Sequence, residues 1–398
     1  MPRSTLEVAD VFRSHGQHWR ESHAGHVSLE QLKVMSGVEH CRSEVLGGHV
    51  LQCPACEHTQ IAYNSCRNRH CPKCQASAAK RWLAARQTEL LPVDYYHVVF
   101  TLPQPISELA YYNKSVMYGL LLKAAAKALL TIGADTKHLG ARLGVTFVLH
   151  TWGSAMIHHP HVHGIIPGGG LSLDGEKWVS CKAGFFLPVR VLSRLFRRLY
   201  LEGLREAYEQ NKLLFFGDCL PIEEEKPFLV WLNSQRKMDW YVYAKRPFAG
   251  PQAVLAYLSR YTHRVAIANS RLVAMDKQTV SFKWKNYRVK EQNRQRTMTL
   301  THDEFIRRFL THVLPSGFHR IRHYGLTANT GRKKSLGKAR QLLNVNEPII
   351  PLDKALSSEA KSHEPTPTFV CPCCGAGMIV TDVLLHLYLP RAPPLLLN

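Results

Sequence analysis

Residues 144–170 read GVTFVLHTWGSAMIHHPHVHGIIPGGG, and this stretch decides the fold around it. Apolar runs on both sides of a polar segment predict two strands joined by a loop. Alternate side chains of a strand point to the same face, so His161 and His163 point one way and Val162 points into the opposite layer. His150, at the end of the first predicted strand, then approaches the pair from the neighbouring strand.

Three imidazoles that converge on one point suit a divalent ion that keeps open positions for a substrate. We therefore predict a metal site at His150, His161 and His163, with the loop between the strands at 154–160. A lone buried histidine is more often a hydrogen-bonded core residue, but an H-x-H pair beside a third histidine favours a metal site. The sequence contains no HExxH motif, which excludes the helical layout of zinc proteases.

The charge of the chain indicates a polyanionic partner. Its 398 residues include 51 Lys and Arg against 30 Asp and Glu, a net charge of +21, which favours nucleic acid or a membrane surface. We expect no membrane-spanning helix, and the beginning MPRSTLEVADVF lacks the apolar core of a signal peptide. We therefore expect a cytoplasmic protein without a membrane partner, whose eleven cysteines bind metal rather than form disulfides.

Two thiolate pairs, Cys53-x-x-Cys56 and Cys71-x-x-Cys74, are separated by fourteen residues. This spacing is typical of a closed tetrahedral zinc site, so we predict one structural Zn²⁺ bound by these four cysteines. Two cysteines and two histidines nearby are candidates either for a second zinc ion or for the core: Cys41, His49, Cys66 and His70.

A further pair, Cys371 and Cys374, stands in the sequence CPCC near the end of the chain. No second pair follows it in the sequence. Three interpretations stay open: a half-site completed by His386, a half-site completed by another part of the chain, or the remnant of a longer module.

The order of the motifs predicts three parts: a zinc-binding DNA-recognition domain at 1–90, a catalytic domain at 91–330, and a basic linker with a cysteine-containing tail at 331–398. The expected elements are helices within 1–40 and at 105–130, 190–209 and 251–264, strands at 97–103 and 240–244, and a hairpin at 271–285. Gly168–Gly170 lacks the Lys-Ser/Thr of a P-loop, so we expect a turn with close backbone approach and no nucleotide cofactor.

The expected helix at 251–264 begins with a proline at its first helical position. Tyr257 and Tyr261 are four residues apart, so both phenols lie on one face of this helix. Such a pair is more often part of a core, but the flanking Arg260 and Arg264 and the metal site upstream favour a functional role.

Three segments, in this order, resemble the rolling-circle insertion-sequence transposases: SCRNRHCPKCQ at 65–75, HPHVHG at 159–164 and YLSRYTHR at 257–264. These enzymes are two-tyrosine members of the HUH endonuclease superfamily with an N-terminal zinc-binding domain, and the resemblance covers roughly residues 40–345. It implies an α+β fold in which an antiparallel sheet with flanking helices carries the histidine pair and faces a helix that carries the tyrosines.

The same resemblance implies that Tyr257 and Tyr261 are the nucleophiles and that His161 and His163 are metal ligands. The third ligand, His150, rests on spacing alone. Three other histidines compete with it: His97, His158 and His159.

A phenol with a pKa near 10 is a weak nucleophile until a divalent ion makes the phosphate more electrophilic. Attack would give a 5′-phosphotyrosine and a free 3′-OH without ATP. Histidine-rich sites favour manganese, cobalt, nickel or zinc on affinity, whereas cellular supply and the resemblance favour Mg²⁺ or Mn²⁺ as the catalytic ion, besides structural Zn²⁺. We expect single-stranded or hairpin DNA ends as the substrate, because a phosphate must enter between helix and sheet. Basic side chains near the motifs are the predicted DNA contacts: Arg67, Arg69, Lys73, Arg260, Arg264, Lys283, Lys285, Arg320 and Arg322.

Two alternatives remain. A plasmid-type replication initiator also carries its tyrosines after the histidine motif, whereas a conjugative relaxase carries them before it, which disfavours the relaxase. From another class, a zinc-dependent DNA-binding protein without catalysis would use the tyrosines as core residues. The zinc module favours the transposase.

Overall fold

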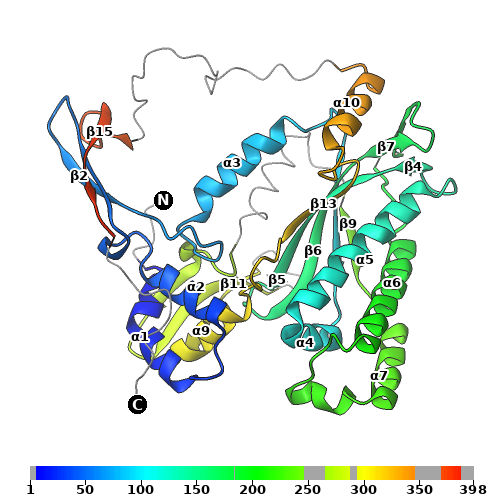
Figure 1. Ribbon diagram of the computed structural model, residues 1–398, viewed down its shortest axis with the longest axis horizontal. Coiled ribbons are helices and arrows are strands. Elements are labelled where there is room, and N and C mark those ends of the chain that lie inside the picture. The colour runs from blue at the N-terminus through cyan, green and yellow to red at the C-terminus, as the bar shows by residue number, and fades with distance from the viewer. Residues whose placement is uncertain (1–5, 183, 246–264, 287–293, 346–368, 387–398) are drawn as a thin grey trace. The chain divides into compact units, whose positions relative to one another are not determined.

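The computed structural model describes residues 6–182, 184–245, 265–286, 294–345 and 369–386 (Figure 1). The chain forms two compact units, and neither is continuous in sequence. The first unit consists of 1–77, 267–313 and 350–398, and the second of 78–266 and 314–349. This division differs from the predicted domains 1–90, 91–330 and 331–398, because a hairpin and the C-terminal segment belong to the first unit.

The second unit is built on a five-stranded sheet in which every neighbouring pair is antiparallel. Its strands, in order across the sheet, are β13 (Ile321–Gly325), β5 (Gly144–Trp152), β6 (His158–Pro167), β3 (Tyr95–Thr101) and β9 (Val242–Lys245). The predicted α+β class with an antiparallel sheet and flanking helices is therefore confirmed.

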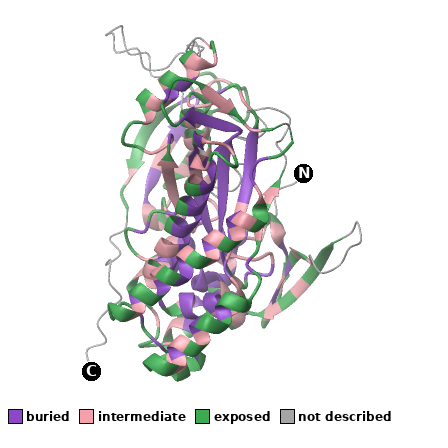
Figure 2. Ribbon diagram, turned by 90° about the vertical axis from the view of Figure 1, so that its right-hand side faces the viewer, coloured by how far each residue is buried: buried purple, intermediate pink, exposed green. Residues whose placement is uncertain are grey.

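One face of this sheet is covered by helices and forms the main core. The helices of this unit are α3 (Gln75–Gln87, whose first residues belong to the first unit), α4 (Gln104–Tyr112), α5 (Lys114–Ala134), α6 (Val189–Glu209), η2 (Gly217–Ile222), α7 (Glu225–Lys237) and α10 (Arg332–Leu342). Figure 1 shows α5 and α6 side by side on the sheet. Phe100, Phe147 and Val162 point into this core and are fully buried, as the purple strands in Figure 2 indicate.

The helix expected at 105–130 is two helices, because Asn113 interrupts it. The buried Asn113 side chain donates to the carbonyl oxygens of Leu109 and Leu214 and accepts from the Leu214 amide. These bonds replace helical ones and let the chain change direction. The second helix, α5, is long and apolar enough to cross a membrane, with a mean hydropathy of 1.5 in its 18-residue window, contrary to our expectation; 61% of that window is buried inside the protein.

A small second sheet explains the glycine run. It contains β4 (Ala141–Arg142), β7 (Gly169–Ser172) and β8 (Trp178–Ser180). A Cβ at Gly170 would lie 2.2 Å from the Arg142 carbonyl oxygen. The predicted close backbone approach is confirmed, but two of the three glycines lie in a strand rather than in a turn.

The first unit has a helical part and two small sheets. Its elements are α1 (Val8–Ser22), α2 (Leu29–Glu39), η1 (Glu44–Leu46), β1 (Gly48–Gln52), β2 (Thr59–Tyr63), η3 (Asn269–Arg271), β10 (Leu272–Met275), β11 (Thr279–Lys285), β12 (Gln295–Thr301), α9 (His302–Thr311), β14 (Phe369–Val370) and β15 (Gly377–Leu384). The expected hairpin at 271–285 is confirmed as β10 and β11. An edge-to-face contact between Phe12 and Phe309, with ring centroids 5.3 Å apart, joins α1 to α9. A second one, between Phe282 and Phe305 at 6.0 Å, joins β11 to α9.

Gly164 lies next to the histidine pair and faces the core. A Cβ there would lie 2.6 Å from the buried Phe147 ring. We expect Gly164→Ala to lower the free energy of unfolding by about 1–3 kcal/mol through overpacking. Denaturant unfolding measures this, with Gly119→Ala as the control, because nothing lies within 4 Å of a Cβ on that helical glycine. Equal stability of the two variants would contradict the close contact.

Candidate functional site

The pairing of β5 with β6 brings three histidines to one face of the sheet. His150 lies directly opposite His161, and His163 follows two residues later on the same strand. The residue between them, Val162, is fully buried in the core on the other face. The alternation predicted from the sequence is therefore present, with the loop at 153–157 and β6 beginning at His158.

The three side chains are close enough to bind one ion. One ring nitrogen from each of His150, His161 and His163 lies within 4.8 Å of the other two. The ring of His163 lies 4.5 Å from that of His150 and 4.8 Å from that of His161. His150 and His163 are buried and His161 is half-buried.

Hydrogen bonds orient two of the three rings. Nδ1 of His161 lies 2.6 Å from the His159 carbonyl oxygen and so donates to it. Nδ1 of His163 lies 2.8 Å from Nε2 of His97. In both rings the hydrogen bond is made by Nδ1, and such a bond is how proteins fix the tautomer of a metal-binding histidine.

The competing histidines therefore have other roles in the described structure. His97 lies on β3 as a hydrogen-bond partner of His163 rather than as one of the three donors. Nε2 of His158 lies 2.7 Å from the Tyr118 hydroxyl group. His159 contributes its backbone carbonyl group to His161.

Burial keeps the rings of His161 and His97 neutral at physiological pH. It lowers the pKa of His161 to about 4 and that of His97 to about 4. A neutral imidazole can bind a metal ion, and a neutral His97 can accept the Nδ1 proton of His163. Three imidazole nitrogen donors fit a divalent ion with open positions for phosphate oxygens.

Tyr257 and Tyr261, together with Arg260 and Arg264, lie outside the described residues. Their roles stay predictions.

The cysteines form two clusters, and their grouping differs from the prediction. The sulfur atoms of Cys41, Cys66, Cys71 and Cys74 lie within 4.8 Å of one another, and so do those of a second set of four. The second set is Cys53, Cys56, Cys371 and Cys374. The structure does not bring the predicted group of Cys53, Cys56, Cys71 and Cys74 together, because the strands β1 and β15 pair and place the C-terminal cysteines beside Cys53 and Cys56.

The first cluster has the electrostatics of a metal site. Sγ of Cys74 lies 3.4 Å from that of Cys41 and 3.5 Å from that of Cys66. Hydrogen bonds within the cluster, from Cys66 above all, lower the pKa of Cys41 to about 7, and those with Cys41 lower the pKa of Cys74 and raise that of Cys71. Four adjacent thiols cannot all ionise because their charges repel, whereas a divalent cation lets all four become thiolates.

The histidines expected in a second zinc site do not join the cysteines. Within the described ranges, His49 and His70 belong to neither sulfur cluster. His49 lies on β1 opposite Val383 and Ala62. The backbone amide of His70 donates to the Asn68 side chain.

The predicted DNA contacts differ in exposure. Arg67, Lys283 and Lys285 are exposed, whereas Arg69 is half-buried and Arg320 is 9% exposed. The ammonium group of Lys73 forms an ion pair with Glu7, and the Arg322 guanidinium group lies 5.0 Å over the Phe318 ring. Burial of Arg320 argues against a direct phosphate contact by its side chain.

Two features of the sites were missed by sequence analysis. His97 was considered only as a ligand, although its place on a buried strand beside the histidine strand is typical of a supporting residue. The sequence does contain a pattern that indicates which cysteine pairs belong together. Cys53-Pro-x-Cys56 and Cys371-Pro-x-Cys374 each precede a strand, whereas Cys71-Pro-x-Cys74 precedes the helix α3.

Comparison with known families gives two matches along the chain. Residues 144–335 match the family described as "Putative transposase". Residues 11–102 match the "Transposase zinc-binding domain" of the IS91 type. The first match includes the histidine cluster and the tyrosine motif, and the second includes the cluster of Cys41, Cys66, Cys71 and Cys74.

Two curated proteins are similar over most of their length. "Putative transposase y4qJ" of Sinorhizobium fredii (strain NBRC 101917 / NGR234) is 51% identical over 385 residues, 96% of each chain. "Transposase for insertion sequence element IS801" of Pseudomonas savastanoi pv. phaseolicola is 24% identical over 360 residues, covering 89% of this chain and 84% of that protein. Among solved structures, "Conjugative Relaxase TrwC in complex with OriT Dna. Metal-free structure." aligns at 11% identity and a TM-score of 0.23, over 63% of this chain and 72% of that chain, which is too low to support an inference.

The hydrogen bond from His163 to His97 predicts a graded effect on metal affinity. We expect the zinc-loaded protein to bind one Mn²⁺ at the cluster, His163→Ala to abolish this binding, and His97→Ala to weaken it 10–100-fold. His97→Gln keeps a hydrogen-bond acceptor and should restore most of the affinity. Isothermal titration calorimetry measures the Mn²⁺ affinity of the parent protein and of the three variants.

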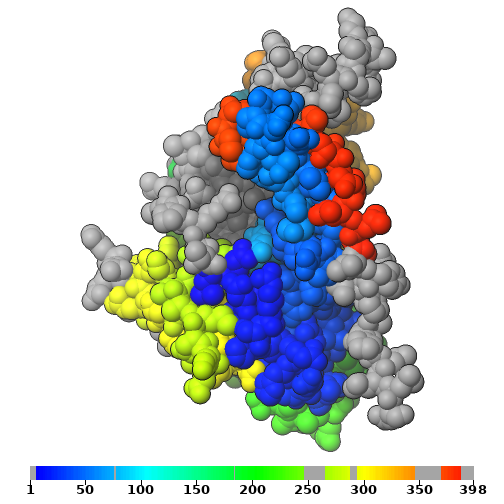
Figure 3. All heavy atoms as spheres, turned by 90° about the vertical axis from the view of Figure 1, so that its left-hand side faces the viewer, coloured from blue at the N-terminus to red at the C-terminus, as the bar shows by residue number. Residues whose placement is uncertain are grey.

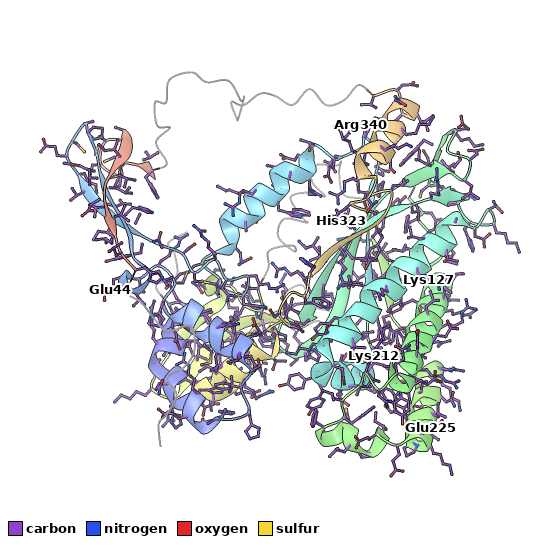
Figure 4. All side chains as sticks on the ribbon, viewed as in Figure 1. Glu44, Lys127, Lys212, Glu225, His323 and Arg340 are labelled. Carbon is purple, nitrogen blue, oxygen red and sulfur yellow. The ribbon has the colours of Figure 1, made fainter. Side chains whose placement is uncertain are left out.

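The control is His323→Ala. His323, labelled in Figure 4, lies on β13 with Nδ1 2.8 Å from the Thr146 hydroxyl group, and it is not one of the three donors. Unchanged Mn²⁺ affinity in His97→Ala would mean that this bond does not orient His163.

Proposed function

Because this chain belongs to the family of IS91-type transposases with a zinc-binding domain, we propose that it cleaves single-stranded DNA at the ends of an insertion sequence and transfers the strands through a 5′-phosphotyrosine. The observation that carries this proposal is the cluster of His150, His161 and His163 on one face of an antiparallel sheet. DNA as the substrate is also consistent with the net charge of +21 and with a cytoplasmic location.

The proposed first step exchanges one phosphodiester for another. The phenolic oxygen of Tyr257 or Tyr261 forms a bond to the scissile phosphorus, the bond from phosphorus to O3′ breaks, and the phenolic proton is transferred, directly or through water, to the leaving O3′. Mg²⁺ or Mn²⁺, when bound by the histidines, would polarise the non-ester oxygens of the phosphate. No ATP is consumed, because the phosphotyrosine conserves the energy of the broken ester.

Two tyrosines permit transfer as well as cleavage. With one tyrosine linked to a 5′ end, the second can attack another DNA strand, and a free 3′-OH can then attack the first phosphotyrosine and release it. Arg260 and Arg264 are the side chains that we propose to neutralise the phosphate between the tyrosines. A phosphate can enter such a site only where the strands are separated or extruded as a hairpin.

We propose that the cluster of Cys41, Cys66, Cys71 and Cys74 holds a structural Zn²⁺ in the DNA-recognition part of the chain. Four sulfur ligands make a closed site with no position for substrate, so this ion would stabilise the fold rather than take part in cleavage. The exposed Arg67 lies between two of these cysteines in sequence, and an ordered loop there would present it to DNA.

A replication initiator would use the same first step, since it shares the order of the histidine and tyrosine motifs. The match of residues 11–102 to a transposase zinc-binding domain favours the transposase. The two activities differ in outcome: joining of cut ends to a second DNA molecule is expected of a transposase.

A nicking assay tests the tyrosine chemistry. With labelled single-stranded element-end DNA and Mn²⁺, we expect a protein-linked DNA band that disappears in the Tyr257→Phe/Tyr261→Phe double variant. Tyr112→Phe is the matched control, because that phenol is exposed at the end of α4 and its ring packs against Phe216. Cleavage by the double variant would refute the assignment of the nucleophiles, and cleavage after removal of all divalent ions would refute the role of the histidines.

The salt dependence of DNA binding tests the proposed contacts of β11. Lys283 and Lys285 are exposed on one face of this strand. If both contact phosphates of single-stranded DNA, Lys283→Ala/Lys285→Ala should reduce the slope of log K against log salt by about 1.4. Fluorescence anisotropy at several salt concentrations measures the slope. The control is Lys123→Ala/Lys127→Ala, which removes two exposed charges from α5; an equal change in both double variants would indicate a general charge effect.

A further inference from the structure

The cysteines of the second sulfur cluster come from the two ends of the chain. Cys53 and Cys56 follow β1, and Cys371 and Cys374 follow β14. The last two lie outside the segment that matches the zinc-binding domain, residues 11–102. We propose that these four cysteines bind a second structural Zn²⁺, which joins the C-terminal segment to the N-terminal zinc-binding domain.

The two halves of the cluster have the same backbone structure. The Cys53 amide donates to the His58 carbonyl group, five residues on, and the Glu57 amide donates back to the Cys53 carbonyl group. The Cys371 amide likewise donates to Ala376, and the Gly375 amide donates back to Cys371.

The turn geometry of the two halves also agrees. Each turn has a positive φ at its fifth residue, 58° at Glu57 and 77° at Gly375. In the C-terminal turn the Cys373 amide lies 3.4 Å from Sγ of Cys371 and so donates to the sulfur. Two matching turns that aim their sulfurs at one point form the closed four-thiolate arrangement of a structural zinc site.

The distances between sulfur atoms agree with a bound ion and exclude disulfides. Sγ of Cys53 lies 3.4 Å from that of Cys374, and Sγ of Cys56 lies 3.6 Å from that of Cys371. Sulfurs bound tetrahedrally at 2.3 Å from zinc lie about 3.8 Å apart, whereas a disulfide needs about 2.05 Å.

The core around this cluster is too small to hold the strands without the ion. The sheet has the order β14-β15-β1-β2, and β15 pairs with β1 from Gly48 opposite Leu384 to Gln52 opposite Ile379. In Figure 3 the red residues of β15 lie against the blue ones of β1 and β2.

Burial in this sheet is slight. Its buried apolar residues are Leu51, Cys53, Cys371 and Met378, so two of the four are cysteines of the cluster itself. Domains with so little apolar burial depend on a metal or on disulfides for stability.

The two sulfur clusters differ in accessibility. Cys41, Cys71 and Cys74 are buried and Cys66 is half-buried, whereas Cys56 and Cys374 are exposed. A chelator can therefore reach the second ion more easily. Loss of that ion would remove the main constraint that holds β15 on β1.

Zinc counting by native mass spectrometry tests the site. We use full-length protein with His161→Ala/His163→Ala, so that the histidine cluster adds no zinc. We expect two Zn²⁺ per chain, one after Cys371→Ser/Cys374→Ser, and two after Cys373→Ser. Cys373 is the matched control, because it is an exposed thiol in the same turn but not a member of the cluster.

Cleavage of the chain tests the connection without altering a cysteine. A protease site is introduced within 350–368, which precedes β14 in sequence, and the cut full-length protein is passed over a gel-filtration column. We expect the C-terminal fragment to elute with the rest of the protein and to separate after treatment with a zinc chelator, with one ion lost before the other.

Either of two results would overturn the proposal: equal zinc content in Cys371→Ser/Cys374→Ser and Cys373→Ser, or separation of the cut fragment without chelator. Neither result depends on DNA cleavage, so the proposal can fail or succeed independently of the proposed function.

Discussion

The register between β5 and β6 is the constraint on which the candidate active site depends. Opposite residues in an antiparallel pair point to the same face, so the alignment of His150 with His161 also aligns Val148 with His163. A slip of one residue would turn the imidazoles into the core and the core residues toward the site. The apolar residues Phe147, Leu149 and Val162 hold the register, because their burial is lost in any other pairing.

The two faces of this sheet therefore have different roles. Its core face is buried under α5 and α6 and accounts for the stability of the unit. Its other face carries the histidine cluster, and burial there lowers the pKa values of His97 and His161. His97 contributes to both roles: it belongs to the buried strand β3, and its ring forms the hydrogen bond that orients His163. The positions of the candidate metal ligands are thus set by strand packing rather than by a flexible loop.

The sulfur clusters, unlike the histidine cluster, do not both lie on a sheet with a large apolar core. The helices α1 and α2 have an apolar core of their own, but the sheet of β1, β2, β14 and β15 has almost none. Its order depends on groups far apart in the chain: Cys53 and Cys374 are 321 positions apart. Closing so long a loop costs conformational entropy, which a metal ion bound by four thiolates can offset. The family comparison places the N-terminal half of this arrangement in a zinc-binding domain.

The sequence by itself determined the features that depend on residues close to one another along the chain. The period of two in HVH predicted a strand and the side on which His161 and His163 lie, and the CPxC spacing predicted metal binding, because both patterns act between residues a few positions apart. Tertiary structure decided the rest. Which cysteine pair meets which, the role of His97 beside His163, and the burial of Arg320 all depend on contacts between distant segments, and local spacing contains no information about those partners.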